Sequence, residues 1–293
     1  MSGNDTLIGL IGANIGKSLS PALHETALAA AGRRGLYHLM DLDVLVGRDL
    51  RALFEAARTA GFAGLNITFP CKQAVIPLLD DLSADAAETG AFNTVVFDGA
   101  GRATGYNTDR LGFRASFRDG LGEAAVAGRG AVVVGAGGAG RAIAFALKDL
   151  GAAEVVVHDT DVARRDGLMA DLRRRFGPAA ARVADDLAAE ISRASGVANA
   201  TPIGMTGIAG NPVPEGVLRA DQWAADAIYT PIRTAFLIEA AGRGARTLDG
   251  GGMCVHQAAD AFWLFTGLEV DLASMRATFL EAQARRDGNI RSS

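Results

Sequence analysis

Short apolar runs alternate with longer amphipathic segments along almost the whole chain. The short runs are rich in Val, Ile and Leu, whereas the longer segments repeat apolar residues every three or four positions. Buried strands that alternate with amphipathic helices indicate an α/β fold. The expected strands are 7–11, 36–42, 64–68, 91–98, 102–106, 131–134, 154–158, 196–199, 223–228 and 246–248; the expected helices are 21–31, 47–59, 73–79, 85–89, 111–121, 141–150, 163–176, 185–195, 255–266 and 272–285.

Local signals refine this pattern at three places. Ser20 precedes Pro21 and is expected to cap the helix that begins there. The strands 91–98 and 102–106 are expected to form a hairpin around Gly99-Ala100-Gly101. The segment 203–216 is rich in Gly and Pro, so we expect a loop that covers a bound cofactor.

One apolar run ends in a glycine-rich turn. The strand 131–134 leads into Gly135-Ala136-Gly137-Gly138-Ala139-Gly140, a helix follows, and the next strand ends at Asp159. In this arrangement Gly135 permits the tight turn, Gly137 lets the backbone approach a pyrophosphate, and Gly140 lets the helix pack on its strand. The pattern therefore predicts a doubly wound dinucleotide-binding domain, with a glycine turn in another α/β protein as the alternative.

Asp159 refines the expected cofactor. A carboxylate at the end of the second strand accepts hydrogen bonds from the ribose hydroxyls of NAD and repels the 2′-phosphate of NADP. Arg164 and Arg165 lie nearby and complicate this interpretation, although an NADP site usually has a basic residue immediately after the strand. NAD is therefore favoured over NADP.

Composition narrows the class of protein. The chain has 293 residues, enough for two domains, with 49% hydrophobic residues and a formal net charge of −4. We expect no nucleic-acid partner, because there is no basic excess, and no membrane partner, because no apolar run is long enough to span one. Two cysteines, Cys71 and Cys254, suit the cytoplasm, and Cys254-x-His256 lacks the second pair that a metal site needs.

Polar residues that interrupt the strand ends of the first half are the candidates for chemistry. Hydroxyls, amides, one Lys and one Asp suit a small polyhydroxylated acid, and Lys72 with Asp109 could accept a hydroxyl proton. Against this, a Lys is more often a solvated surface residue, and Asp109 could simply cap the following helix. Cys71, His24 and His256 are expected to pack or form structural hydrogen bonds. The candidates are Ser18, Ser20, Asn66, Thr68, Lys72, Asn93, Thr94, Asn107, Thr108 and Asp109.

Seven short motifs run in order along nearly the whole chain: Ser18-Leu19-Ser20-Pro21-Ala22-Leu23-His24, Asn66-Ile67-Thr68-Phe69-Pro70-Cys71-Lys72, Gly90-Ala91-Phe92-Asn93-Thr94, Gly105-Tyr106-Asn107-Thr108-Asp109, Asn199-Ala200-Thr201-Pro202-Ile203-Gly204-Met205, Asp226-Ala227-Ile228-Tyr229-Thr230-Pro231 and Gly252-Met253-Cys254-Val255-His256-Gln257-Ala258. They resemble the motifs of the shikimate dehydrogenase family, most closely its NAD-dependent quinate/shikimate dehydrogenase branch.

The resemblance implies a reversible oxidation of the C3 hydroxyl of shikimate or quinate to the 3-dehydro ketone. It implies a substrate domain over 1–110, completed by the C-terminal helices from about 250 to 293, and an NAD-binding domain over 111–249. Lys72 and Asp109 are the implied catalytic residues. Ser18, Ser20, Asn66, Thr68, Asn93, Tyr229 and Gln257 are implied to bind substrate; the glycine segment 135–140, Asp159, Arg164, Thr201, Ile228, Gly252 and Met253 are implied to bind cofactor.

Departures from the family pattern keep alternatives open. Arg110 stands where the family usually has Gly, Cys71 replaces a commonly aromatic residue, and Ser20 stands where some quinate-active members carry Thr. An NADP-dependent biosynthetic shikimate dehydrogenase, an aminoshikimate dehydrogenase, a tetrahydrofolate-type dehydrogenase and a non-catalytic nucleotide-sensing module are the alternatives. We expect a monomer or homodimer that needs no metal.

Overall fold

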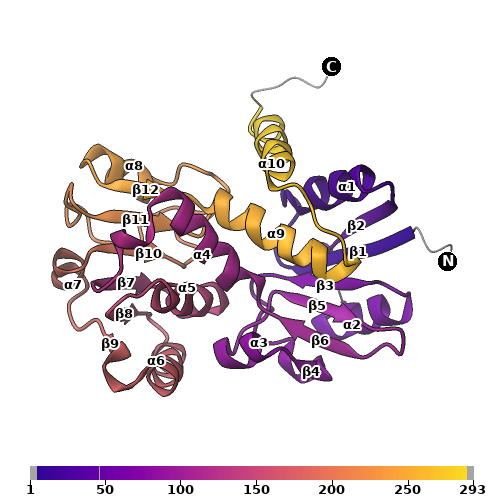
Figure 1. The fold of residues 1–293 in the computed structure, drawn as a ribbon, viewed down its shortest axis with the longest axis horizontal. Coiled ribbons are helices and arrows are strands. Elements are labelled where there is room, and N and C mark those ends of the chain that lie inside the picture. The colour runs from indigo at the N-terminus through magenta and orange to yellow at the C-terminus, as the bar shows by residue number, and fades with distance from the viewer. Residues whose placement is uncertain (1–4, 46, 289–293) are drawn as a thin grey trace. The chain divides into compact units, whose positions relative to one another are not determined.

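The computed structural model describes residues 5–45 and 47–288 of the chain (Figure 1). The chain divides into two compact units. Unit 1 holds the chain up to Thr108 together with the chain from Val255 onward, and unit 2 holds Asp109–Cys254. Each unit is built around one six-stranded sheet with helices beside it (Figure 1). The α/β architecture expected from the alternating pattern is therefore confirmed.

The sheet of unit 1 mixes parallel and antiparallel neighbours. Its strand order is β2-β1-β3-β5-β6-β4. β1 pairs in parallel with β2 and β3, β5 is antiparallel to both β3 and β6, and β4 is parallel to β6. The strands are β1 (Asp5–Gly12), β2 (Arg34–Asp41), β3 (Gly64–Ile67), β4 (Asp81–Leu82), β5 (Thr94–Phe97) and β6 (Ala103–Tyr106).

Side-chain caps fix where two helices of unit 1 begin. Asp49 accepts a hydrogen bond from Ala52 N at the start of α2, and Ser83 accepts one from Ala86 N at the start of α3. One face of α2 packs on the sheet, because Leu53, Phe54 and Ala57 are buried. The helices are α1 (Ser20–Ala30), α2 (Leu50–Thr59), the 3-10 helix η1 (Ile76–Leu78), α3 (Ala84–Thr89), α10 (Leu272–Arg286) and, from Val255, α9 (Gly250–Thr266).

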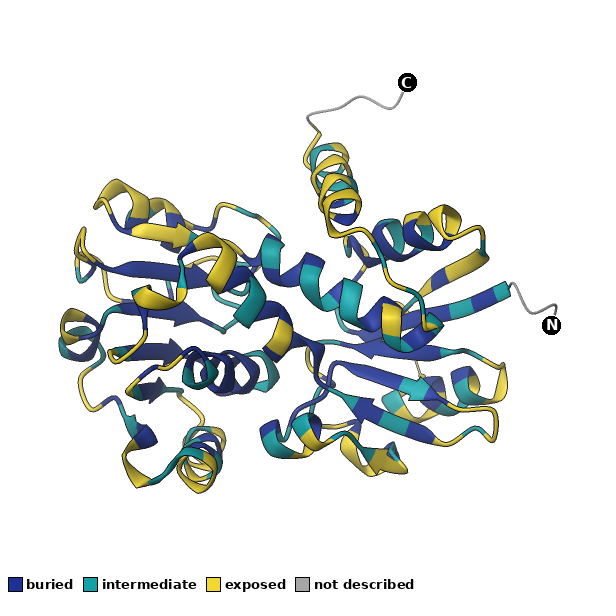
Figure 2. Cartoon of the chain, viewed as in Figure 1, coloured by how far each residue is buried: buried dark blue, intermediate teal, exposed yellow. Residues whose placement is uncertain are grey.

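The sheet of unit 2 is parallel throughout. Its order, β12-β11-β10-β7-β8-β9, is that of the doubly wound dinucleotide-binding fold, with the first strand of the unit next to the point where the order reverses. Its central strands are dark blue in Figure 2 because they are buried. The strands are β7 (Gly130–Val134), β8 (Glu154–His158), β9 (Ala181–Val183), β10 (Gly196–Asn199), β11 (Trp223–Asp226) and β12 (Arg246–Leu248).

Helices of unit 2 cover this sheet with apolar faces. In α5 eight consecutive residues are buried, and Ile143 and Phe145 are among the core residues of the unit. Such a helix, apolar around most of its surface, belongs to the interior of a two-faced α/β layer. The helices are α4 (Thr108–Gly120), η2 (Glu123–Ala125), α5 (Gly138–Asp149), α6 (Val162–Phe176), η3 (Pro178–Ala180), α7 (Leu187–Arg193) and α8 (Ala235–Gly242).

The structure corrects several sequence predictions. Ser20 is the first residue of α1 and not its cap: the cap is Leu19, which forms no side-chain cap hydrogen bond. The helix expected over 73–79 is a turn followed by the 3-10 helix η1, because Pro77 lacks the N–H that an α-helix needs. The strand expected to begin at 91 begins at Thr94, and the one expected to reach 228 ends at Asp226. β4, β9 and α8 were not predicted.

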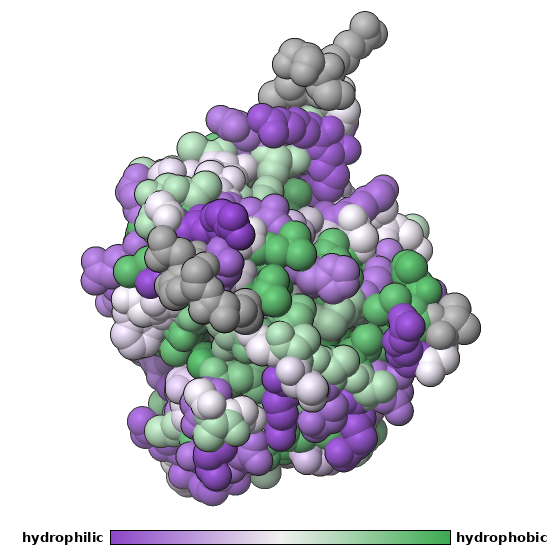
Figure 3. Space-filling view, turned by 90° about the vertical axis from the view of Figure 1, so that its right-hand side faces the viewer, coloured by the Kyte–Doolittle hydropathy of each residue, from purple (hydrophilic) through white to green (hydrophobic). Residues whose placement is uncertain are grey.

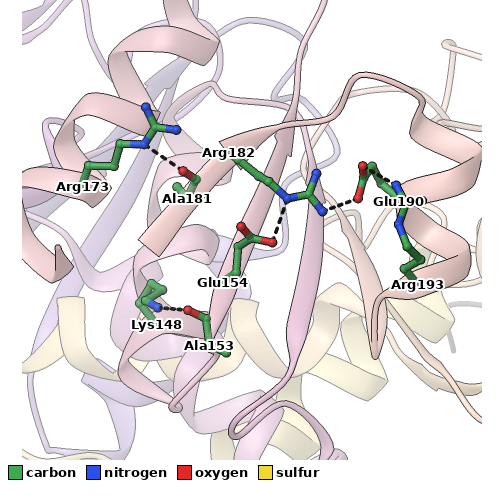
Figure 4. Close-up of polar contacts among 8 residues, drawn as sticks. All are labelled: Lys148, Ala153, Glu154, Arg173, Ala181, Arg182, Glu190 and Arg193. Carbon is green, nitrogen blue, oxygen red and sulfur yellow. Dashed lines mark hydrogen bonds and ion pairs between the residues drawn. The ribbon is translucent and has the colours of Figure 1, made fainter. Parts of the chain in front are cut away.

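Polar side chains attach the edge strand β9, as Figure 4 shows. Arg182 of β9 donates to Glu154 of β8 at 2.9 Å and also to Glu190 of α7. Arg193 binds the second oxygen of Glu190 at 2.6 Å. The hydrogen bond from Arg182 and the charge of Arg193 hold the pKa of the buried Glu190 near 2, well below its usual 4.5. This ion-pair group links β9 to β8 and to α7.

On the face drawn in Figure 3, hydrophobic residues form several separate groups between hydrophilic ones. Scattered groups of this kind are ordinary on protein surfaces. Within residues 5–45 and 47–288, no helix is both long and apolar enough to cross a membrane.

Candidate active site

Most of the predicted substrate residues lie along one edge of the sheet in unit 1, where β1, β3 and β6 end and β5 begins. β1 and β3 run in parallel and end at Gly12 and Ile67, and Asn66 of β3 lies opposite Thr94, the first residue of β5. Thr94 in turn lies opposite Tyr106, the last residue of β6. The segments that leave these ends carry Ser18, Ser20, Asn66, Thr68, Lys72, Asn93, Thr94 and Thr108. Strand direction and register therefore bring the first four motifs together.

Buried hydrogen bonds join the amides and hydroxyls of this edge. Asn66 Nδ2 donates to Asn93 O at 3.2 Å and to Thr94 Oγ1 at 3.0 Å. Asn93 Nδ2 donates to Thr108 Oγ1 at 2.7 Å, and Asn93 Oδ1 accepts from Thr108 N, also at 2.7 Å. Asn93 Nδ2 lies 3.4 Å from Gln257 Oε1, which brings α9 to the same cluster. We call these five residues the amide–hydroxyl cluster.

Tyr37 extends the amide–hydroxyl cluster and was missed by sequence reasoning. Its hydroxyl donates to Asn66 Oδ1 at 2.8 Å. Its ring stacks on His24, with the centroids 4.7 Å apart. The alternating pattern of 36–42 predicts that some of its side chains are buried, but it does not show that one hydroxyl reaches a partner 29 residues away.

Further predicted residues of unit 1 lie on loops and at the helix start beside the same edge. Lys72 is half-buried, and its carbonyl accepts from Phe92 N, which places its backbone beside the residue before Asn93. Ser18 Oγ accepts from Ser20 N at 3.2 Å, so the two serines are locally ordered at the start of α1. Thr68 O accepts from Cys71 N in the turn that leads to Lys72.

Two neighbouring titratable residues are unsuited to acid–base chemistry. His24 is fully buried, neither ring nitrogen has a hydrogen-bond partner among the described residues, and burial lowers its pKa to about 3. Burial also raises the pKa of the Cys71 thiol, which disfavours the reactive thiolate. These observations agree with the packing roles expected for both residues.

Asp109 and Arg110 open unit 2. Asp109 is buried and follows Thr108 of the amide–hydroxyl cluster in the chain. Arg110 binds Asp149 through two hydrogen bonds of 2.6 and 2.7 Å and lies over the Phe145 ring. The residue that departs from the family pattern thus anchors the first turn of α4 to α5. The pairing of Asp109 with Lys72 stays a prediction.

The glycine segment of unit 2 forms a tight turn that leads directly into α5. Gly135 has a φ of +105°, and a Cβ there would lie 2.8 Å from Ala200 O. A Cβ on Gly140 would overlap Gly135 O, so glycine is required for the helix to approach the strand. A Cβ on Gly137 would meet nothing within 4 Å, and α5 begins without a side-chain cap. Open backbone at an uncapped helix start fits a bound phosphate group.

Asp159 lies directly beside the glycine segment. Its Oδ2 accepts from Ala136 N at 2.6 Å, and its Oδ1 accepts from Asp161 N at 2.8 Å. Each carboxylate oxygen keeps a lone pair for a ribose hydroxyl. Arg164 is exposed and forms an ion pair with Asp161 at 3.2 Å, and Arg165 pairs with Asp166 at 2.9 Å.

Several predicted cofactor residues have structural partners inside unit 2. Both the N–H and the hydroxyl of Thr201 donate to Asn199 Oδ1. Gly252 packs so closely on Ser116 of α4 that a Cβ would overlap its hydroxyl, and Met253 belongs to the hydrophobic core. Packing thus accounts for Gly252 and Met253. Their contact with a cofactor stays a prediction, and so does the contact of the half-buried Tyr229 with substrate.

Among the described residues, no group of three or more His, Cys, Asp or Glu could hold a metal ion.

A parallel doubly wound sheet with an open glycine turn, joined in one chain to a unit that bears a polar cluster, defines a two-unit protein of the dinucleotide-binding α/β class. Comparison with known proteins makes the assignment narrower. Residues 10–95 match the model of the shikimate dehydrogenase substrate binding domain.

Similar proteins cover nearly the whole chain. The chain is 45% identical to a quinate/shikimate dehydrogenase (NAD(+)) of Corynebacterium efficiens, over 96% of this chain and 99% of the relative. It is 48% identical to a shikimate dehydrogenase (NADP(+)) of Streptomyces avermitilis, over 96% and 97%. The structure of quinate dehydrogenase from Corynebacterium glutamicum in complex with NAD matches with a TM-score of 0.85 and 43% identity, over 95% of this chain and 100% of that one. The chain belongs to the shikimate dehydrogenase family.

Proposed function

We propose that this protein is an NAD-dependent dehydrogenase that reversibly oxidises the C3 hydroxyl of shikimate or quinate to the 3-dehydro ketone. The observation that carries the proposal is the single sheet edge in unit 1 that gathers Lys72 with the amide–hydroxyl cluster. The names of the relatives from the two Corynebacterium species support this choice of substrates and cofactor.

Each unit is proposed to bind one of the two molecules that react. Unit 1 would hold the ring substrate, and the glycine segment with Asp159 in unit 2 would hold the dinucleotide. A dinucleotide held there would supply the hydride acceptor for C3 in its nicotinamide ring. Lys72 Nζ takes the hydroxyl proton during oxidation, while the C–O single bond becomes a carbonyl, and returns the proton during reduction. Asp109 orients the lysine.

The internal hydrogen bonds of unit 1 limit which atoms can contact a substrate. Both protons of Asn66 Nδ2 have acceptors, so Asn66 is proposed to offer Oδ1 to a ring hydroxyl. Gln257 and Thr68 would bind other ring hydroxyls. Ser18 and Ser20 would bind the carboxylate itself, since hydroxyls at a helix start need no full positive charge to hold an anion.

The preference for NAD over NADP rests on the charges after β8. A 2′-phosphate would meet the Asp159 carboxylate, and the two arginines that could neutralise it are each paired with an aspartate. The Streptomyces relative with an NADP(+) name is 48% identical to this chain, against 45% for the Corynebacterium efficiens relative. The proposal therefore depends on these local charges more than on overall identity.

Replacement of the lysine tests the reaction. Lys72→Ala should lower kcat about 10²–10⁴-fold and leave dinucleotide affinity unchanged, because it removes proton transfer alone. Lys148→Ala is the matched control, since Lys148 Nζ donates to the backbone carbonyl of Ala153 (Figure 4) and to that of Ala152, both in unit 2. Near-normal turnover of Lys72→Ala would contradict the proposed role, and a wild type inactive on both acids would contradict the proposed function.

A further inference from the structure

Two motifs of unit 2 begin at the ends of neighbouring strands. β10 ends at Asn199, the first residue of Asn199-Ala200-Thr201-Pro202, and the adjacent β11 ends at Asp226, the first residue of the motif 226–231. Asn199 and Asp226 are paired in the sheet register and are both buried. They stand at the carboxyl edge of the parallel sheet, where doubly wound folds bind their ligands.

The Asp226 carboxylate holds three donors. Asn199 Nδ2 and Ile228 N each donate to Oδ1 at 3.0 Å. Thr234 Oγ1 donates to Oδ2 at 2.7 Å, and Thr234 is also the cap of α8. One carboxylate therefore ties the end of β10, the segment after β11 and the start of α8 to one another.

Asn199 extends this connection into the first motif. Its Oδ1 accepts from the N–H of Thr201 at 2.9 Å and from its hydroxyl at 2.7 Å. Its Nδ2 also reaches Ile203 O at 3.3 Å. The shape of the segment 199–203 thus depends on the orientation of one amide, and Asp226 fixes that orientation by accepting from its nitrogen.

The charged groups on the elements packed against β11 are engaged elsewhere. β10 carries none; on β12, Arg246 lies opposite Trp223 at the other end of β11 and donates to Leu121 O. On α8, Glu239 accepts from Gly216 N and Asn211, and after β12, Asp249 accepts from Gly251 N. Burial without a cationic partner raises the pKa of Asp226 from 3.8 to about 6, although its three donors act in the opposite direction.

We propose that Asp226 is a positioning residue for the cofactor, whose ionised carboxylate holds the segments 199–203 and 226–234 in the conformation that binds the dinucleotide. Three donors converge on acceptor oxygens, and a carboxylate satisfies them better than a neutral acid or amide, which carries hydrogens of its own. The inference rests on the proposed function, because Thr201 and Ile228 are the residues expected to meet the cofactor.

We expect the folding stability and the cofactor affinity to change in opposite directions as the pH rises. Because the folded state raises the pKa of Asp226, its contribution to stability is fully present below pH 3.8 and is lost as the pH rises through about 6. Cofactor affinity, in contrast, should depend on the ionised form and rise through the same pH range. A residue with a purely structural role would change both quantities in the same direction.

The test measures NAD binding to the full chain by titration calorimetry, together with thermal stability, between about pH 5 and 8. At pH 8 Asp226→Asn should bind NAD about tenfold more weakly than wild type, from the loss of hydrogen bonds to a charged acceptor. Its affinity should change little with pH, whereas the wild-type affinity falls below pH 6. Its melting temperature at pH 8 should equal or exceed that of wild type. Asp221→Asn, on the surface of the same unit, is the matched control.

A second pair of variants keeps the test decisive if Asp226→Asn does not fold. Thr234→Ser keeps the donor to Oδ2 and should bind NAD as wild type does, whereas Thr234→Ala should bind it about threefold to tenfold more weakly. Equal NAD affinity of wild type, Asp226→Asn and Thr234→Ala would overturn the inference alone, and so would parallel losses of affinity and stability. A wild type that binds neither NAD nor NADP would overturn the proposed function and the inference with it.

Discussion

Tyr37→Phe is the smallest change that tests whether the amide–hydroxyl cluster of unit 1 binds substrate. The substitution removes one hydroxyl and keeps the ring, so the stack on His24 remains. It leaves Asn66 Oδ1 without its 2.8 Å donor at a position where only 6% of the residue is exposed. The loss of one partner of a buried hydrogen bond costs about 1–3 kcal/mol.

That cost divides between folding and substrate binding. The free energy of unfolding, measured with denaturant, should fall by about 1–2 kcal/mol. If Asn66 Oδ1 also accepts a ring hydroxyl, the KM for shikimate or quinate should rise about threefold to tenfold, at about 1.4 kcal/mol for each factor of ten. The KM for the dinucleotide should not change, because Tyr37 and Asn66 both belong to unit 1.

Initial rates with varied substrate provide the assay, and Tyr106→Phe provides the control. Tyr106 is half-buried in β6, and its carbonyl, which accepts from Asn93 N, survives the substitution. In a double-mutant cycle, Tyr37→Phe should add almost nothing to the KM effect of Asn66→Ala, since the two side chains act through one hydrogen bond. Independent, additive effects of Tyr37 and Asn66 on KM would refute the reasoning, as would an unchanged KM in Tyr37→Phe.

Three further predictions address the cofactor, the carboxylate and the fold. Asp159→Ser should shift the kcat/KM preference towards NADP, because it removes the charge that opposes a 2′-phosphate; an unchanged preference would contradict this role. Ser18→Ala should lower kcat/KM about 10–100-fold for both acids and leave NAD affinity unchanged, whereas a shikimate ester should lose little further activity with this variant. Glu190→Gln should lower the free energy of unfolding by about 1–3 kcal/mol at neutral pH, a value reduced because Arg182 is partly exposed. Because the folded pKa of Glu190 lies near 2, this contribution is present above pH 4.5 and is lost as the pH falls through 2, so denaturation curves of variant and wild type should converge there.

Local sequence signals predicted most of the elements. The strands β7 and β8 of unit 2 contain runs of three valines, and α6 repeats apolar residues at helical spacing, so local patterns located these elements. β9 has only three residues and is held by the Arg182 ion pairs, a tertiary cause that no local pattern shows. α8 was missed because Ala-Phe-Leu-Ile-Glu-Ala-Ala-Gly has a single charged position and therefore no polar face to reveal a helical period.

In the candidate site, too, some residue roles have local causes and others depend on contacts between distant segments. The role of Gly140 and the positive φ of Gly135 could be predicted because both depend on the backbone of one turn, whereas the close approach of Ala200 to Gly135 could not. The link from Tyr37 to Asn66 could not, because it depends on strand pairing across the unit. The sequence carried one indication of the role of Asp226, because it is a charged residue at the end of a buried strand and begins the motif 226–231. Its three donors, however, come from separate segments that only the fold brings together.

The most direct test of the account is a set of initial rates for the wild-type protein with shikimate and quinate, each with NAD and with NADP. The account predicts that at least one of the two acids is oxidised with NAD, with a higher kcat/KM for NAD than for NADP, and that Lys72→Ala loses this activity. Higher kcat/KM with NADP would contradict the role of Asp159. Absence of turnover with either acid and either cofactor would contradict the proposed reaction itself.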